Sequence, residues 1–356
     1  MNIRKNLSPR TGRLAAVLGF ALALLLLYSL ETARAAPYQL QGASNAAAQD
    51  SDISSEDADA LQKVQDAIDR QDWRTAVDLL TPLANRKNAE AAYALGRLVQ
   101  TGSGIRKSAA RAAQYFRISA EQGDPRGQNA YGEALASGEG VKRNFLEASR
   151  WFTRAAEEGH AGAQFNLAYL YALGRGVKKN ENKAIDWYTR AANQGLAEAQ
   201  YSLAWIYMHS KGENQDDTKA VHWLEKAADQ DHPKAQNDLG FMYSQGRGFA
   251  PDPAKALMWY QKAADQNYAP AQYNMGFCYE LGMGVHQDFG RAVEWYRKAA
   301  ENNDAAAQYS LGLMYEQGTG VPYSIAEAKK WYELAAANGD SDARKALRDL
   351  QKSKKK

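Results

Sequence analysis

The sequence repeats itself every 36 residues, and this period limits the fold more than any other feature. Residues 89–340 hold seven consecutive units of this length, with no insertion or deletion between them. One position of every unit is aromatic: Tyr115, Trp151, Trp187, Trp223, Trp259, Trp295 and Trp331. A fixed period of this size is typical of repeat architectures, in which each unit packs only against its neighbours. The chain is therefore predicted to be one repeat array rather than two or three separate globular domains.

Each unit is predicted to contain two helices joined by a tight turn. Apolar residues recur at helical spacing in 196–210 and again in 220–228. A Gly-x-Gly sequence separates the two helices in six of the seven units. The second helices are predicted to end at residues that tolerate a left-handed backbone conformation: Gly123, Gly159, Gly195, Asp231, Asn267, Asn303 and Gly339. One hairpin cannot bury its own apolar face, so the units are expected to stack into an all-α solenoid.

The predicted domain organisation places this array between two caps. The seven units cover 89–124, 125–160, 161–196, 197–232, 233–268, 269–304 and 305–340. Residues 57–88 form a shorter hairpin in register with the second-helix columns, and 341–356 form a capping helix with a basic tail. Residues 36–55 are rich in Ala, Ser, Gln and Asn, a composition typical of a flexible linker. A repeat array needs such atypical end units to be soluble.

The N-terminus has the three parts of a secretory signal. Basic residues without any acid precede an apolar run from Leu14 to Leu30, and a small-x-small sequence ends at Ala35. The run is shorter than the ~20 residues that span a bilayer comfortably, which favours cleavage near Ala35 over an uncleaved signal-anchor. Because no cysteine precedes Cys278, the protein is not a lipoprotein. The predicted location is the periplasm or the exterior, and the alternative is an inner-membrane anchor at Leu14–Leu30.

The repeat unit resembles the Sel-one-like repeat family, a relative of the tetratricopeptide repeat. The stretches that carry the resemblance are residues 163–195 and 271–304. It implies a right-handed superhelix of antiparallel helix pairs whose first helices line a concave face. It also implies protein–protein scaffolding. One cysteine-rich subgroup is linked to β-lactam binding or hydrolysis, but this chain lacks the paired cysteines, and that link does not carry over.

The sequence predicts no catalytic residue, no metal site and no cofactor. It contains no HExxH, GxSxG or GxxxxGK[ST] motif, and its Gly-x-Gly turns join helix to helix without a preceding strand. His209 and His222 near Asp216 and Asp217 form a weak alternative metal site, but no i,i+4 pairing supports it. Cys278 falls in a column of apolar residues and is expected to be buried. The net charge of +3 does not indicate nucleic-acid binding.

The relationship to tetratricopeptide repeats implies that ligand-facing positions lie on the first helix. Two positions four residues apart share one helical face, and the 36-residue period stacks them along the array. They form a predicted aromatic ladder: Phe165, Tyr169, Tyr201, Trp205, Phe241, Tyr273, Phe277 and Tyr309. Such rings are typical of protein-recognition anchors, but they could equally pave the inner wall of the solenoid.

The predicted function is a non-enzymatic scaffold or adaptor in a bacterial envelope that binds a protein or peptide on the concave face. No disulfide and no nucleic-acid partner are expected, and no membrane span remains after signal cleavage. Three alternatives stay open: a module that binds envelope glycan or peptidoglycan, an envelope hydrolase of the β-lactam-linked subgroup, and a secreted effector that acts on a host.

Overall fold

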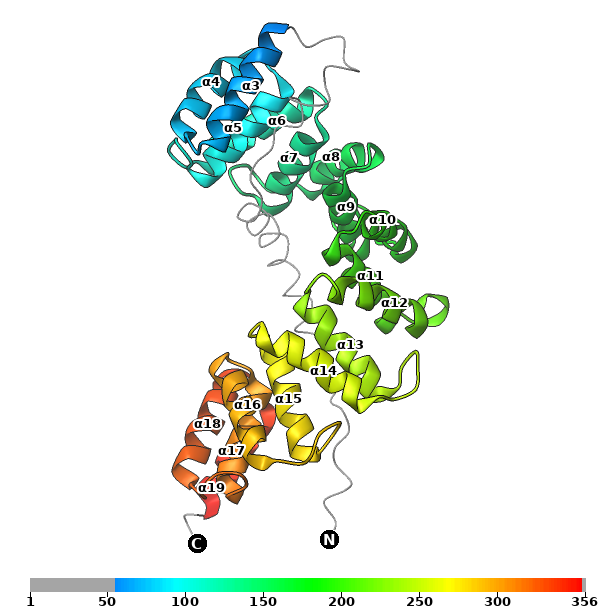
Figure 1. The fold of residues 1–356 in the computed structure, drawn as a ribbon, viewed down its shortest axis with the longest axis vertical. Helices are drawn as coiled ribbons and strands as arrows, with labels where there is room; N and C mark the ends of the chain where they lie inside the picture. Colours follow the sequence, from blue (N-terminus) through cyan, green and yellow to red (C-terminus); the bar gives the residue numbers. More distant parts are fainter. Residues whose placement is uncertain (1–54, 354–356) are drawn as a thin grey trace. The chain divides into compact units, whose positions relative to one another are not determined.

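The computed structural model describes residues 55–353 and folds them into 17 α-helices without a strand (Figure 1). The predicted signal at Leu14–Leu30, the predicted linker before Ser55 and the last three lysines lie outside the described residues. Among residues 55–353, no helix combines the length and the apolar character needed to cross a membrane. The predicted all-α solenoid is confirmed, because the seven repeats fold as consecutive helix pairs and neighbouring helices within each compact unit pack in chain order.

The helices have the following bounds. Before the repeats come α3 (Ser55–Asp69) and α4 (Trp73–Asn85). The first helices are α5 (Ala89–Thr101), α7 (Pro125–Ser137), α9 (Ala161–Leu173), α11 (Ala197–His209), α13 (Pro233–Gln245), α15 (Ala269–Leu281) and α17 (Ala305–Gln317). The second helices are α6 (Ala109–Glu121), α8 (Phe145–Glu157), α10 (Glu181–Asn193), α12 (Asp217–Ala228), α14 (Pro253–Asp265), α16 (Phe289–Glu301) and α18 (Ile325–Ala337). The last helix is α19 (Ser341–Ser353).

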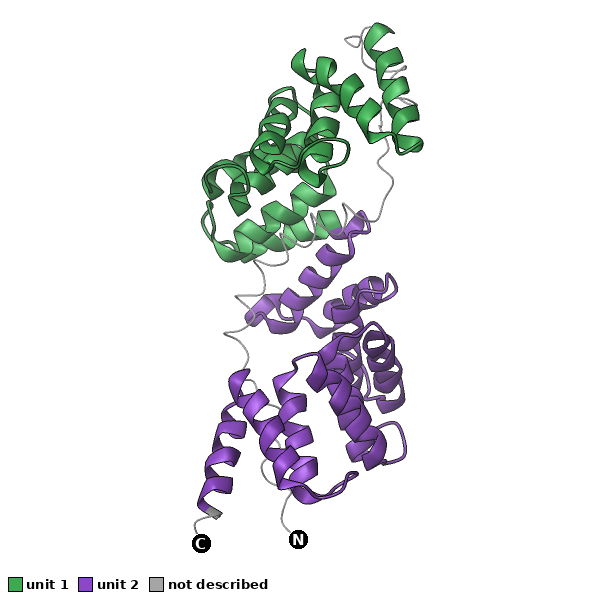
Figure 2. Cartoon of the chain, turned by 90° about the vertical axis from the view of Figure 1, so that its left-hand side faces the viewer, with its two compact units in different colours: residues 1–191 green, residues 192–356 purple. Residues whose placement is uncertain are grey.

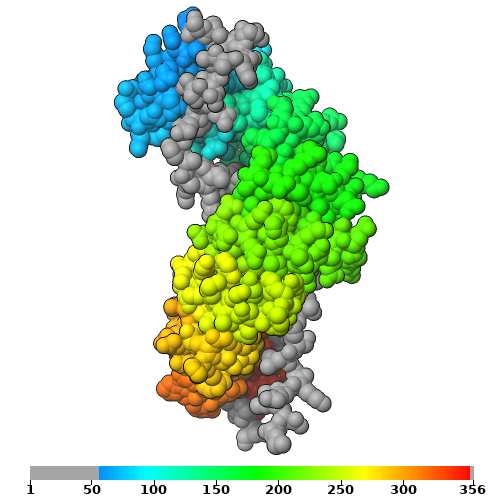
Figure 3. All heavy atoms as spheres, turned by 45° about the vertical axis from the view of Figure 1, so that its right-hand side comes forward, coloured from blue at the N-terminus to red at the C-terminus, as the bar shows by residue number. Residues whose placement is uncertain are grey.

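The chain divides into two compact units, which Figure 2 shows in different colours. Unit 1 covers residues 1–191 and unit 2 covers residues 192–356. Within each unit the helices form antiparallel hairpins that follow one another in chain order. Figure 3 shows this order on the surface of unit 2, where each segment lies beside the segments that adjoin it in sequence. Each unit is therefore built from contacts between neighbours, as expected for stacked repeats.

Capping residues recur with the same period as the repeat. The residue before each second helix has a side chain that accepts a hydrogen bond from the backbone N–H three residues on. These N-cap residues are Ser108, Asn144, Asn180, Asp216, Asp252, Asp288 and Ser324. The predicted ends of the second helices are confirmed, because all seven predicted residues have positive φ, from 58° at Asp231 to 93° at Gly123. The period therefore sets where helices start and stop.

The core of most hairpins pairs a large ring on the second helix with a small residue on the first. Tyr296 of α16 has no exposed surface, and Gly276 of α15 faces its ring. A Cβ atom added at Gly276 would lie 2.6 Å from Tyr296 Cδ1, closer than any real contact. Alanine takes the small position in repeat four, where Ala204 belongs to the same column and Leu224 replaces the ring. The two helices can therefore approach closely only because this column is small.

In repeats three to seven, a buried glutamine on the first helix joins the hairpin to the one before it. Its side-chain amide donates to a backbone carbonyl of the preceding second helix, eight residues earlier, as Gln308 does to Ala300 at 3.0 Å. Gln164, Gln200, Gln236 and Gln272 repeat this bond at 3.1–3.4 Å. In unit 2 the glutamine oxygen also accepts a bond from an amide 30 residues later, such as Asn338 Nδ2 at 2.9 Å. Buried polar groups are thereby satisfied at every one of these joints.

Candidate partner-binding face

The first helices carry the two ladder columns predicted from the sequence. The first column holds Phe165, Tyr201, Tyr273 and Tyr309, together with Asn129 and Asn237. The second column, four residues later, holds Tyr169, Trp205, Phe241 and Phe277, together with Glu133 and Leu313. Unit 1 contains Phe165 and Tyr169 on α9, and unit 2 contains the other predicted ladder residues on α11, α13, α15 and α17. We refer to these two columns as the first-helix face.

In unit 1 the two ladder rings are buried. Phe165 is 6% exposed and Tyr169 is 8% exposed. Phe165 packs on Tyr188 of its own repeat, with ring centroids 5.5 Å apart. The hydroxyl of Tyr169 is buried and finds no hydrogen-bond partner among the described residues. These two rings fill the interior of the hairpin, and their role in binding stays a prediction.

In unit 2 the ladder rings are half-buried and keep part of their surface in solvent. Tyr273 and Tyr309 lean on the buried tyrosines of their own second helices, with ring centroids 5.5 and 5.6 Å apart. Trp205 stacks on the exposed His209 at 4.6 Å, within the same helix. First-column rings in these repeats therefore contribute to packing between helices. In the second column, Trp205 contacts a ring only within its own helix, and Phe241 contacts no ring among the described residues. These two residues therefore contribute least to packing between helices.

Polar side chains join the first helices of neighbouring repeats. The residue directly after the first column bonds to the first column of the preceding repeat, 37 positions away in sequence. Asn166 Nδ2 donates to Asn129 Oδ1 at 3.0 Å, and Asn274 Nδ2 donates to Asn237 Oδ1 at 2.8 Å. Sequence reasoning missed these bonds. The sequence does contain a signal for these bonds: the column directly after the first ladder column holds Asn or Asp in some repeats and Ala or Ser in the others.

Glu133 of α7 lies within this polar layer in unit 1. Its Oε1 accepts hydrogen bonds from Asn129 Nδ2 at 2.9 Å and from Asn166 Nδ2 at 3.1 Å. Burial raises the pKa of Glu133, and the two asparagine bonds and the charge of Arg97 offset only part of the shift. The first-helix face of unit 1 therefore holds a carboxyl group that is costly to ionise.

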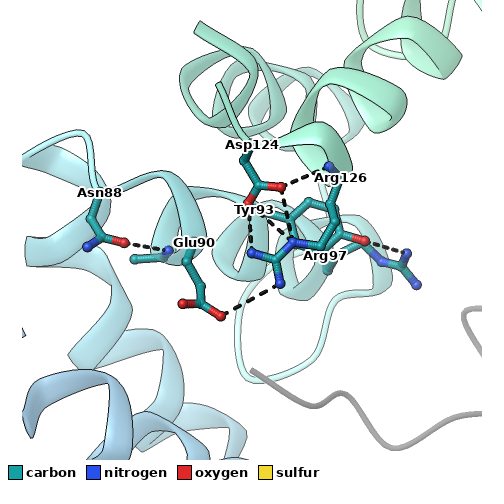
Figure 4. A network of polar contacts seen from close by, with 7 residues as sticks. Asn88, Glu90, Tyr93, Arg97, Asp124 and Arg126 are labelled. Carbon is teal, nitrogen blue, oxygen red and sulfur yellow. Dashed lines mark hydrogen bonds and ion pairs between the residues drawn. The ribbon is translucent and has the colours of Figure 1, made fainter. Parts of the chain in front are cut away.

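A second network ties α5 to α7 in unit 1 (Figure 4). Arg126 Nη2 donates to Asp124 Oδ2 at 2.7 Å, and Nη1 lies 3.6 Å from Glu90 Oε1. The same guanidinium covers the Tyr93 ring at 5.2 Å. Asp124 also caps α7 by accepting from the Arg126 backbone N–H. Arg97 donates to the Tyr93 hydroxyl at 3.4 Å. Because the Arg126 side chain contacts residues of both helices, this network holds the start of α7 against α5.

Tyr201 lies at the centre of a polar cluster in unit 2. Its ring stacks on His232 at 4.8 Å, and its hydroxyl donates to Asp238 Oδ2 at 3.1 Å. His232 Nε2 lies 3.3 Å from Glu198 Oε2, and Asn237 donates to the other oxygen of Asp238. Burial raises the pKa of Tyr201 well above its usual value, and the Asp238 charge adds to the shift. Burial likewise raises the pKa of Asp238. Tyr201 therefore belongs to the structure of this joint as much as to its surface.

Three residues of the alternative metal site have other roles. His209 stacks on Trp205, Asp216 caps α12, and Asp217 pairs with Arg247, with Oδ1 and Nη2 2.5 Å apart. Within residues 55–353, no group of three His, Cys, Asp or Glu side chains is placed to hold a metal ion. Cys278 is 2% exposed, and burial raises the pKa of its thiol to about 12. It is therefore a packing residue rather than a nucleophile at neutral pH.

The two glycines of the Gly-x-Gly turns have separate structural roles. The first glycine ends the first helix in the left-handed conformation, as Gly282 does with φ 71°. The second glycine lies against the backbone of the preceding second helix, and a Cβ atom at Gly284 would lie 2.2 Å from Pro253 O. Repeat four differs, since its turn forms a short 3₁₀ helix, Gly212–Asn214. These turns are therefore packing devices, as the helix-to-helix connection predicted.

Comparison with known proteins agrees with this fold. A protective antigen from uropathogenic Escherichia coli with an SLR fold is 32% identical, with a TM-score of 0.70, over 77% of this chain and 59% of that one. A Sel1 repeat protein from Oxalobacter formigenes is 30% identical, with a TM-score of 0.62, over 68% of this chain and 96% of that one. The chain thus spans about three fifths of the antigen's length.

No curated protein sequence matches the chain. The family model for the Sel1 repeat matches seven consecutive segments, namely 89–124, 125–160, 161–196, 197–232, 233–268, 269–304 and 305–340. These matches cover most of the chain and coincide with the seven helix pairs of the structure. The chain belongs to the Sel1 repeat family.

Proposed function

We propose that this protein is a non-enzymatic scaffold that binds a protein or peptide on the first-helix face of unit 2. Sel1-repeat proteins generally serve as protein-interaction scaffolds, and their fold is typically non-catalytic. The observation that carries the proposal for this chain is the row of half-buried rings on α11, α13 and α15, which keep apolar surface in solvent. Aromatic rings that stay partly exposed on a rigid scaffold are suited to anchor a partner.

Within the second column, Trp205 and Phe241 are the best candidates for residues that anchor a partner. Trp205 contacts only His209 of its own helix among ring partners, and Phe241 makes no ring contact among the described residues. Tyr201, by contrast, holds Asp238 and stacks on His232. A binding test based on Tyr201 would therefore mix lost affinity with lost stability. Trp205 and Phe241 are the residues that separate the two effects.

The test is capture of a partner from an envelope extract by the purified protein. Trp205→Ser with Phe241→Ser should abolish capture while helicity and melting temperature stay close to wild type. The matched control replaces two exposed apolar residues of second helices in the same unit, Met258→Ser with Leu334→Ser, and should capture as wild type. Equal loss in both variants, or capture unchanged in the first, would refute binding on this face.

We also propose that the chain works in the cell envelope after export, with cleavage near Ala35. The support is the signal-like sequence before residue 36. That a similar protein is a protective antigen of a uropathogen is also compatible with a location outside the cytoplasm. Fractionation of cells that express the tagged chain, with sequencing of its N-terminus, tests this. A cytoplasmic product that begins at Met1 would refute it.

A further inference from the structure

The first helices of unit 2 carry acidic side chains that pair with no lysine or arginine of the described residues. Helices α11, α13, α15 and α17 contain four acids and one lysine, Lys234. The acids are Glu198, Asp238, Glu280 and Glu316. Glu198 pairs with His232, and within residues 55–353 none of the four forms an ion pair with lysine or arginine. On the second helices of unit 2, by contrast, some acids do pair with lysine, as Glu333 does with Lys329 at 3.3 Å.

Two of these acids are fixed beside the ladder. Glu280 and Glu316 each follow a first-column tyrosine by seven residues and therefore share its helical face. Glu280 Oε2 accepts a bond from Tyr296 Oη at 2.5 Å, and Glu316 Oε2 accepts one from Tyr332 Oη at 2.5 Å. Both tyrosines are fully buried, so each carboxylate is anchored on its inner side. The other oxygen, Oε1, has no donor among the described residues, and both side chains are half-buried.

An aromatic surface beside a fixed carboxylate suits a long basic side chain. The apolar stem of lysine or arginine packs on a ring while its charged end reaches the carboxylate. The protein already contains one half of this contact on its second helices. Lys262 lies 4.1 Å from the Trp259 ring centre, and Lys298 lies 4.0 Å from that of Trp295. On α15, Phe277 stacks on Tyr273 at 6.5 Å and stands one turn before Glu280.

We propose that α15 and α17 form a subsite for a lysine or arginine side chain of the bound protein segment. The subsite consists of the half-buried rings at Tyr273 and Phe277 and the carboxylates of Glu280 and Glu316. This inference rests on the proposed function, because it names the chemistry of the segment that the first-helix face binds. Charge complementarity selects the occupant: an acidic segment would bring further negative charge to Glu280 and Glu316, whereas a basic segment would pair with them.

The test uses three short fluorescent peptides that alternate phenylalanine and serine and differ only at two further positions. These positions hold lysine, norleucine or glutamate, so that the first two peptides match in shape and differ in charge. Binding to the full chain is measured by fluorescence polarisation. We expect the lysine peptide to bind about tenfold more tightly than the norleucine peptide at low salt, with the difference shrinking as salt screens the charges.

Variants locate the effect. Glu280→Gln with Glu316→Gln should erase the lysine preference, while the glutamine oxygens still accept the two tyrosine bonds and helicity stays unchanged. Glu294→Gln with Glu333→Gln, on second helices, makes the same change in net charge and should keep the preference. Lysine binding that appears only after removal of residues 354–356 would assign the subsite to the protein's own tail and overturn the proposal.

The remaining outcomes separate this inference from the proposed function. Equal binding of the lysine and norleucine peptides refutes the basic-residue subsite but leaves an apolar binding face. Equal loss of preference in both double variants refutes it as well, since the effect would then follow net charge alone. If none of the three peptides binds, the subsite is refuted, and the capture experiment with Trp205 and Phe241 still decides on the face itself.

Discussion

The buried glutamine of the repeat should contribute measurably to the joint between hairpins, and Gln308 offers the cleanest test. It is 2% exposed, donates to Ala300 O on α16 and accepts from Asn338 after α18. Gln308→Met keeps the length of the side chain and removes both hydrogen bonds. Ala300 O retains the Asn303 N–H as a donor at 3.1 Å, and the exposed Asn338 amide can turn to water.

The expected cost follows from these partners. Two hydrogen bonds at a net value of about 1 kcal/mol each give a loss of about 2 kcal/mol, because no buried group is left wholly unsatisfied. This corresponds to about a 30-fold change in an equilibrium constant. In a repeat array, stability is a sum of unit and interface contributions, so the loss should appear locally. Opening of α17, α18 and α19 should become about 30-fold more frequent, while α5 to α8 should be unaffected.

Hydrogen exchange measured by mass spectrometry resolves this difference, whereas a single melting curve averages over repeats that do not unfold together. The control is Gln317→Met, which makes the same chemical change at an exposed position at the end of α17. Exchange in α17 to α19 that rises less than about threefold in Gln308→Met would show that the glutamine bond does not hold the joint. A similar rise in Gln317→Met would show that the effect belongs to methionine on this helix.

Three further predictions follow from the same contacts. Burial raises the pKa of Glu133. Between the pKa of the unfolded chain and that of the folded protein, the folded protein therefore binds more protons at this group. The contribution of Glu133 to stability then falls as pH rises through the folded pKa. Glu133→Gln, whose oxygen can keep both asparagine bonds, should therefore raise the urea midpoint more at pH 7 than at pH 4, and an equal change at both would contradict this. Gly276→Ala drives a Cβ into Tyr296 and should cost about 1–3 kcal/mol in thermal melts, whereas at the exposed Gly290 of α16 a Cβ would meet only the Asp288 side chain, at 3.3 Å, so Gly290→Ala should cost much less. Cys278, buried and with a pKa raised to about 12, should react with iodoacetamide at pH 8 only after denaturation, and rapid native labelling would show that α15 opens.

Much of the fold could be predicted from the sequence because local chemistry repeats with the period. The left-handed helix ends, such as Gly123 and Asp231, depend only on the residue type at one position. The burial of Cys278 could be predicted because its column is apolar in the other repeats. Such features need no knowledge of how one hairpin sits on the next.

The polar joints could not be predicted because they depend on the offset between neighbouring hairpins. Asn166 reaches Asn129 across 37 residues rather than 36, so the bonded residues belong to different columns. The same limit applies to the ladder. Phe165 and Tyr273 occupy one column, yet the first is buried and the second half-buried, since exposure depends on the side chains that surround each ring. A period identifies equivalent positions but does not determine their environment.

Polar residues interrupt the aromatic ladder, and they limit the chemistry of a bound segment more than the rings do. Asn237 interrupts the first column in unit 2 and bonds to both Asp238 and Asn274. Burial already raises the pKa of the Asp238 carboxyl, and an apolar surface laid over it would remove more water from a group that is costly to desolvate. A uniformly apolar segment should therefore bind more weakly than one with a hydrogen-bond donor at this point. Under the proposed function, we expect the partner to alternate apolar and polar groups along α11, α13 and α15, because rings and carboxyl groups alternate there.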